Sequence, residues 1–150
     1  MDIKNIVRIG IVSTINTETC SVRVTFLDKQ DTVSDDLPVL NRGSMVVKDY
    51  WLPDIGEQVL CLFLGNGKNK GFILGSFFSS VDKPSSSGAG KRIVDFGDGT
   101  VVEYEKASIT INSSKAVNIV APTGDVVVNG ISLVNHIHPE SIGSVTGKPQ

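Results

Sequence analysis

A short apolar pair recurs between residues 101 and 129, and this repeat limits the folds open to the chain more than any other feature. Its members are Val102/Tyr104, Ile109/Ile111, Val117/Ile119 and Val126/Val128. Successive pairs begin seven, eight and nine residues apart, with a polar turn after each pair. A near-constant period of this length indicates stacked β-strands. We expect strands at 93–96, 101–105, 108–112, 116–120 and 125–129.

The repeat also predicts association between chains. Residues i and i+2 of a strand lie on the same face, so the paired residues give the ribbon one apolar face. A ribbon of one chain cannot bury that face alone and is marginal in water. Three ribbons wound about a shared axis would bury all three faces and leave few open edges. Burial therefore requires association, although it does not by itself fix the number at three.

The first half of the chain reads as a run of short strands with no helical period. In residues 20–27 the side chains of Cys20, Val22, Val24 and Phe26 alternate with polar ones. Further strands are expected at 5–15, 59–64 and 71–78. Five or so short strands in fewer than ninety residues favour a small barrel of the oligonucleotide/oligosaccharide-binding (OB) type over residues 1–80.

Two segments interrupt this run of strands. The stretch from residue 28 to residue 57 carries Tyr50 and Trp51, and the sequence allows two interpretations of it, a plug for the barrel's end or a contact surface. Residues 81–90 are rich in serine and glycine, a composition typical of a linker.

The only two histidines of the chain, His136 and His138, are separated by one residue. On a strand they would project from the same face, and imidazole is the commonest metal ligand in proteins. Two interpretations stay open from the spacing alone, a metal-binding pair and two surface histidines. Cys20 and Cys61 lie within alternating apolar patterns and are expected to be core thiols without a disulfide.

Composition narrows the classes of function. The net charge is −2, and the 14 basic residues are scattered, so no electrostatic case exists for nucleic-acid binding. The start of the chain lacks the apolar core of a signal peptide, and the longest apolar run, 59–64, is too short for a bilayer. We therefore expect a chain made in the bacterial cytoplasm.

Three motifs resemble one known family. They are Trp51-Leu52-Pro53-Asp54-Ile55-Gly56-Glu57-Gln58-Val59-Leu60, then Gly71-Phe72-Ile73-Leu74-Gly75-Ser76-Phe77, and finally His136-Ile137-His138 followed by Thr146-Gly147-Lys148-Pro149. In this order, with a strand repeat between them, they are similar to the baseplate assembly protein V family. Its members form the central spike of contractile-tailed bacteriophages and phage-like particles. The resemblance covers nearly the whole chain.

The resemblance implies an all-β homotrimer with an OB-fold barrel at 1–80 and a linker at 81–90. An intertwined trimeric β-helix, or prism, would follow at 91–131, and a metal-capped tip at 132–150. The implied function is mechanical, because the tip would pierce the host cell envelope while the barrel attaches to the tail hub and baseplate proteins. The implied location is the tail baseplate of a virion or phage-like particle.

In this family the histidine pair of each chain meets on the three-fold axis and holds one iron ion. His136 and His138 match that motif, so the resemblance implies six imidazole nitrogens around one ion per trimer. Structural zinc sites are almost always tetrahedral, and an octahedral nitrogen set therefore favours iron. With every position filled, the ion would be structural and not catalytic.

Two rival functions remain. A cupin-like metalloenzyme would use His136, His138 and Glu140, but such a site needs a further ligand and more barrel strands. An OB-fold module binding nucleic acid or carbohydrate would need a positive groove and stacking aromatics, whereas aromatic residues make up only 6% of this chain. We expect neither enzyme activity nor nucleic-acid binding.

Overall fold

The computed structural model describes residues 6–65, 70–138 and 143, and it divides the chain into two units, Met1–Ser85 and Ser86–Gln150. The division falls inside the predicted linker. Regular structure in the described residues consists of β-strands and one 3-10 helix, η2 (Leu27–Lys29), without an α-helix. The predicted all-β class is confirmed. Within these ranges, no helix has the length and hydropathy that a membrane crossing requires.

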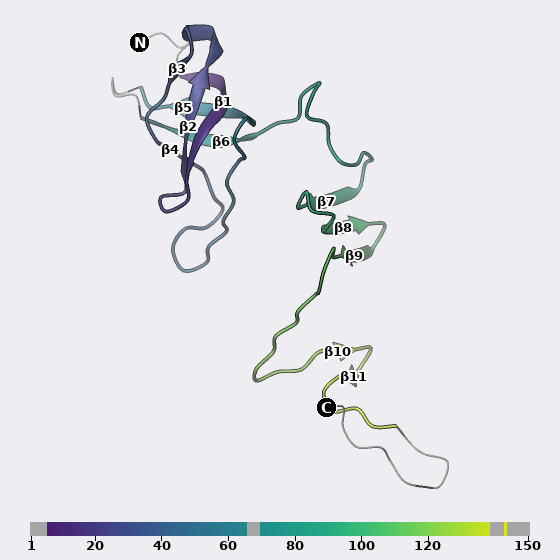
Figure 1. Ribbon diagram of the computed structural model, residues 1–150. Coiled ribbons are helices and arrows are strands. Elements are labelled where there is room, and N and C mark those ends of the chain that lie inside the picture. Colours follow the sequence, from purple (N-terminus) through teal and green to yellow (C-terminus); the bar gives the residue numbers. More distant parts are fainter. Residues whose placement is uncertain (1–5, 66–69, 139–142, 144–150) are drawn as a thin grey trace. The chain divides into compact units, whose positions relative to one another are not determined.

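The first unit contains one six-stranded sheet (Figure 1). Its strands are β1 (Val7–Asn16), β2 (Ser21–Phe26), β3 (Thr32–Val33), β4 (Leu37–Pro38), β5 (Gln58–Phe63) and β6 (Gly71–Ser76). The order is β3-β2-β1-β5-β6, and β4 pairs with the other end of β2. A parallel bridge between Val39 and Ile73 then joins the chain after β4 to β6, with Leu40 N donating to Ile73 O at 3.0 Å.

The four strands predicted in this unit correspond to β1, β2, β5 and β6, with ends shifted by one or two residues. Asn5, the first residue of the predicted 5–15 strand, lies outside the described residues. The two-residue strands β3 and β4 were not predicted. Each is too short for an alternating pattern to be seen in the sequence.

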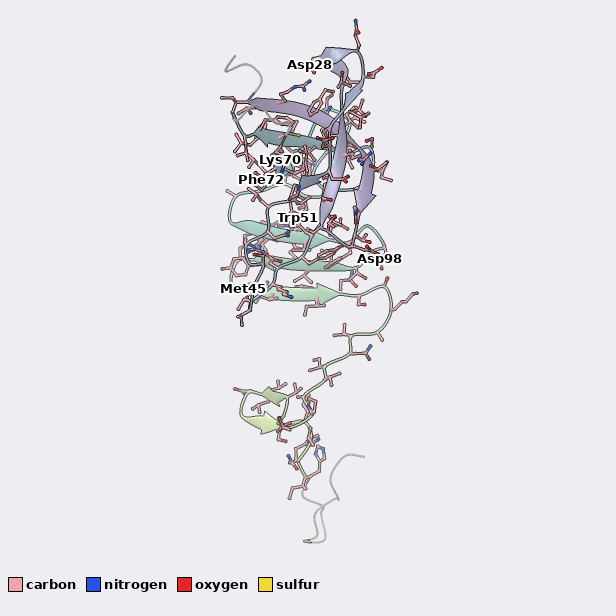
Figure 2. All side chains as sticks on the ribbon, turned by 90° about the vertical axis from the view of Figure 1, so that its left-hand side faces the viewer. Asp28, Met45, Trp51, Lys70, Phe72 and Asp98 are labelled. Carbon is pink, nitrogen blue, oxygen red and sulfur yellow. The ribbon has the colours of Figure 1, made fainter. Side chains whose placement is uncertain are left out.

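The loop between β4 and β5 separates the two neighbouring aromatic residues. Trp51 packs against the core and its Nε1 donates to Leu40 O at 3.2 Å, whereas Tyr50 is exposed. Asn41 closes the base of the loop, because its Oδ1 accepts from Trp51 N at 3.3 Å. Figure 2 shows Trp51 next to the strands and Met45 at the outer end of the same loop. Trp51 therefore serves packing, and the outer part of the loop is surface.

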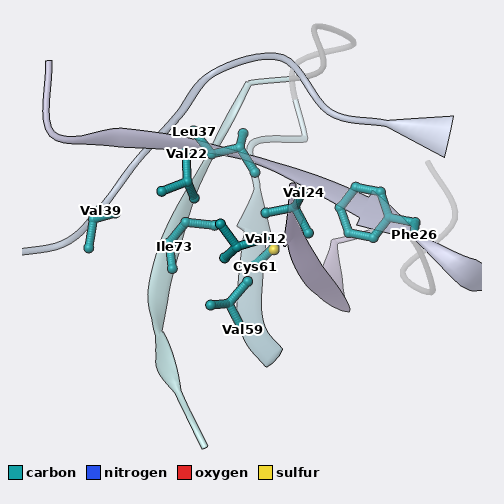
Figure 3. Close-up of a cluster of buried hydrophobic side chains, with 9 residues drawn as sticks. All are labelled: Val12, Val22, Val24, Phe26, Leu37, Val39, Val59, Cys61 and Ile73. Carbon is teal, nitrogen blue, oxygen red and sulfur yellow. The ribbon is translucent and has the colours of Figure 1, made fainter. Parts of the chain in front are cut away.

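Nine side chains form the core of the first unit (Figure 3). They are Val12, Val22, Val24, Phe26, Leu37, Val39, Val59, Cys61 and Ile73. Both cysteines are free, as expected, with Cys61 buried and Cys20 half-buried against the cluster. Arg8 closes one side of the core, since its guanidinium lies 3.6 Å from the centre of the Phe26 ring and pairs with Asp28 at 2.7 Å.

The second unit holds a three-stranded antiparallel sheet and a small hairpin. The sheet consists of β7 (Lys91–Asp95), β8 (Val101–Glu105) and β9 (Ser108–Asn112), in that order. The hairpin consists of β10 (Val127–Val128) and β11 (Ile131–Ser132). Asn129 and Gly130 turn it, with φ of 49° and 81°. Positive φ at both turn residues is the requirement of the tight two-residue hairpin, which favours Asn-Gly.

Two predictions for the second unit are wrong for the single chain. Residues 116–120 are not a strand, and the strand expected at 125–129 is reduced to Val127–Val128. A strand exists only where its backbone groups pair with a neighbour, and Val127–Val128 pairs with Ile131–Ser132, the segment directly after it. The Asn129-Gly130 turn thus competes with the stacked arrangement inferred from the repeat. The closed barrel and the trimeric prism stay predictions.

Candidate metal centre and assembly face

His136 and His138 follow β11, beyond a turn at residues 133–135, and are not part of a strand. The strand geometry assumed for them is therefore wrong, but their rings still lie together. The ring centroids are 5.0 Å apart and the ring planes meet at 88°. His136 is half-buried and His138 is exposed. The structure thus brings both predicted site residues into one place on the chain.

Ser132 holds His136 through its backbone carbonyl. Ser132 O accepts from the backbone nitrogen of His136 at 3.2 Å and lies 2.9 Å from its ring Nδ1. A carbonyl oxygen only accepts, so this contact places the ring hydrogen on Nδ1 and leaves the Nε2 lone pair available. Metal-binding histidines are oriented by the same kind of contact in many proteins. The Nε2 atom of His136 is therefore suited to binding a metal ion.

Asp125 and Ser132 fix the turn that carries the histidines. The Ser132 hydroxyl donates to the Asp125 carboxylate, and this bond is the main reason that the pKa of Asp125 lies below its usual range. Val134 N donates to Asp125 Oδ1 at 3.3 Å, and Asn135 N donates to Ser132 Oγ at 2.7 Å. The sequence interpretation missed both residues. The Asn129-Gly130 dipeptide between them predicts a tight hairpin turn, and this was the sequence signal that could have brought the two residues together.

One described chain supplies only two imidazoles to this candidate centre. Across the described ranges, no group of three or more His, Cys, Asp or Glu side chains lies together in a metal-binding arrangement. Glu140, the third ligand of the cupin-like alternative, lies outside the described residues, as does the 146–149 part of the tip motif.

A second candidate feature is the apolar face of the β7-β8-β9 sheet. The pairing register places Val94, Val102 and Ile111 side by side, and Tyr104 beside Ile109. Directly opposed residues of antiparallel strands share a face, so these five side chains form one surface, which is apolar apart from Arg92 opposite Tyr104. We call this set the apolar face. Ile111 is 57% exposed, although it is a large hydrophobic side chain.

The opposite face of the same sheet, which we call the polar face, carries charged side chains together with the apolar Ile93 and Val101. Lys91 Nζ lies 2.6 Å from Glu103 Oε1 and 3.2 Å from Glu105 Oε2. Hydrogen bonds to Glu103, and then to Glu105, raise the pKa of Lys91 above its usual value. Thr110 lies opposite Glu103 on the same face. Most charged side chains of this sheet thus lie on one face and most apolar ones on the other, a distribution typical of a sheet that is covered on one side only.

The two units differ in what a single chain buries. The first unit has a cluster of fully buried side chains, whereas no described residue of the second unit is buried. Its exposed apolar side chains continue past the sheet, through Val117 and Ile119 to Ile131. An exposed set of neighbouring apolar side chains such as the apolar face marks an interaction site.

Comparison with known proteins adds independent support. No family model matches the chain. The chain is 29% identical over 123 residues, or 79% of its length, to a protein of Escherichia phage P2 named "Spike protein". The match covers 56% of that protein, so the chain spans about half the length of the curated relative it matches. Together with the three motifs, this similarity supports placing the chain in the phage baseplate spike family.

Proposed function

We propose that this chain is the structural central spike of a contractile tail baseplate and works as a homotrimer. The observation that carries the proposal is the second unit, which has no buried side chain among its described residues and leaves the apolar face of its β7-β8-β9 sheet uncovered. Such a unit is stable only when partners cover that face. We infer that the partners are copies of the same chain, as the resemblance to the spike family implies, and the similarity to a phage spike protein supports this.

In this proposal the second unit winds with two others into a prism around the apolar faces. Residues 116–120, which pair with no strand in one chain, would then find their partners in neighbouring chains. The polar face with Lys91 and Glu103 would remain toward solvent. This arrangement is consistent with the alternation of the sequence and with the need to satisfy every strand edge.

The first unit serves as the attachment domain. The Val39–Ile73 bridge connects the two ends of its sheet through the segment after β4, which supports an OB-type barrel. Since its core is complete within one chain, this unit can present a preformed surface to the tail hub. The tip at the other end of the chain would meet and pierce the host envelope, and the site of action would be the tail baseplate.

The histidines of three chains would hold one iron ion at the tip. His136 and His138 fit that role, because Ser132 O orients His136 and leaves its Nε2 available, and the two rings are adjacent. Two ligands per chain from three chains give an octahedral set. The ion would supply a structural cross-link at a point where a tapering tip has little apolar surface left to bury. The proposal assigns no catalytic role to any residue.

Native mass spectrometry combined with elemental analysis of never-chelated protein tests the proposal. The expected result is a trimer with about one iron per three chains, the stoichiometry of an octahedral site with two ligands per chain. A monodisperse monomer at micromolar concentration would overturn the spike assignment. One metal per chain would instead favour an open, cupin-like centre.

A further inference from the structure

The outer part of the β4–β5 loop is a closed hairpin at residues 42–49. Ser44 and Lys48 form an antiparallel bridge, and Asp49 N donates to Gly43 O at 3.0 Å. An ion pair of 2.6 Å between Arg42 Nε and Asp49 Oδ2 joins the two arms. Gly43 is required here, because a Cβ at this position would collide with Val47 O. The 42–49 hairpin is thus held in one conformation.

The tip of this hairpin consists of three consecutive apolar side chains. Met45 is 84% exposed, Val46 91% and Val47 80%. Isolated exposed apolar residues are ordinary, but three in succession on a braced turn form an apolar tip. Bracing lowers the entropy lost on binding, so this tip is preorganised for contact. Arg42 and Lys48 flank it, and with Asp49 they give the hairpin a net charge of +2 − 1 = +1.

The first unit also carries a groove of about 470 Å³ whose lining is apolar and acidic, and so complementary to the apolar, basic hairpin. The residues that matter for its character are Ile55, Phe77, Phe78, Asp54, Glu57 and Asp82. The three apolar side chains among them are 40% exposed or more. Lys83 is the one cation in its lining, so three carboxylates and one ammonium give a net charge of −3 + 1 = −2. We call this the acidic groove.

We propose that the 42–49 hairpin of one chain inserts its apolar tip into the acidic groove of a neighbouring copy. The tip and groove match in polarity, since an apolar tip with basic flanks meets a groove lined by apolar and acidic side chains. The inference rests on the proposed homotrimer. A contact between two different patches of identical chains is heterologous, and such contacts close into a ring when the rotation is correct. Three hairpin–groove contacts would join the three first units.

A cysteine pair tests this contact directly. Val46→Cys places a thiol on the tip and Phe78→Cys places one in the acidic groove. A disulfide forms only where the two Cα atoms approach within about 7 Å. Under mild oxidation, the chain with both substitutions should run as a covalent trimer on a denaturing, non-reducing gel. Neither single variant, nor the unsubstituted chain, should form a cross-linked product.

Mixed assemblies distinguish a directional ring from a symmetric contact. The two singly substituted chains, Val46→Cys and Phe78→Cys, are unfolded together and reassembled. Each mixed ring then contains one contact in which a Val46→Cys tip faces a Phe78→Cys groove. The expected product is therefore a covalent dimer and no covalent trimer. The charge variant Lys48→Glu, made in the doubly substituted chain, should reduce the cross-linked yield.

Native mass measured on the same samples separates the two proposals. Trimers that give no cross-link in the doubly substituted chain would overturn the hairpin–groove contact and leave the spike assignment standing. Monomers would overturn both. Cross-linking in the Val46→Cys chain alone would also overturn the contact, because it would mean that the tips meet one another.

Discussion

At the scale of the residue, Cys61 shows how burial changes chemistry. Its side chain lies in the core of the first unit with no exposed surface. Burial raises the pKa of the Cys61 thiol from 9.0 to about 11, and the nearby charge of Arg8 opposes this only in part. The neutral thiol is therefore the form that the folded chain accepts.

This shift predicts a loss of stability in alkali. Below pH 9 the thiol is protonated in both folded and unfolded chains, so its contribution is fully present. As pH rises from 9 through about 11, the unfolded chain releases the proton first and the folded state loses that contribution. Urea unfolding followed by the fluorescence of Trp51, the only tryptophan, should show a larger fall in midpoint between pH 8 and 10.5 for the native chain than for Cys61→Val.

Cys20→Ser is the matched control, because it changes a half-buried thiol, leaves Cys61 in place and avoids a β-branched side chain at a residue with φ of 50°. It should retain the alkaline fall of the native chain. Equal falls in the native chain and in Cys61→Val would contradict the assignment of this pH dependence to Cys61.

His136→Ala combined with His138→Ala should abolish iron binding and leave the trimer intact. The apolar face, which carries most of the proposed association, lies on β7, β8 and β9 and is untouched by these changes. Metal content measured after purification should fall from about one ion per three chains to near zero. Ile137→Ala, between the two ligands, should keep the metal. Loss of the trimer in the double variant would show that the tip and not the sheet holds the chains together.

At the scale of the element, the β7-β8-β9 sheet predicts opposite effects for two neighbouring residues. Ile111→Asp should block assembly, because it would place three like charges around one axis at a cost of several kcal/mol per ion. Asn112→Asp should assemble normally, since Asn112 lies on the polar face, opposite Val101 and not opposite another carboxylate. Ile119→Asp should behave as Ile111→Asp does. Sedimentation of the three variants measures the outcome, and a normal trimer from Ile111→Asp would reverse the inferred faces.

Strands that pair with the next strand along the chain could be predicted from their apolar pattern in the sequence. Both β8 and β9 have the bounds expected from the repeat, because each strand pairs with the strand next in sequence. Residues 116–120 have a similar pattern but are not a strand, since a pattern specifies a face and not a partner. The histidine pair could be predicted as a candidate site because histidine is the commonest metal ligand in proteins. The support from Asp125 and Ser132 was missed because it depends on the fold of the β10–β11 hairpin.

At the scale of the whole molecule, the chain is divided between a unit that completes its own core and a unit that does not. A chain ending at residue 90 should therefore fold, because all nine core residues lie between Val12 and Ile73. It should unfold cooperatively in urea, and under the proposed attachment it should match the full chain in binding to the tail hub. A fragment of residues 86–150 should show no cooperative unfolding transition in circular dichroism at concentrations where it is monomeric. A folded monomeric fragment would contradict the burial argument.

This division determines the order in which folding and association take place. The ribosome releases the N-terminal unit first, and that unit has everything it needs to fold while the rest is still being made. In the proposed trimer the second half must wait for two other copies, so its completion would depend on how many chains the cell contains. Once three first units have met, linkers of ten residues would keep the remaining segments close together and replace a rare three-way encounter with a local one. Until then, protease cleavage of newly made chains should concentrate after Ser85, and the rate of spike production should rise more steeply than the rate of synthesis.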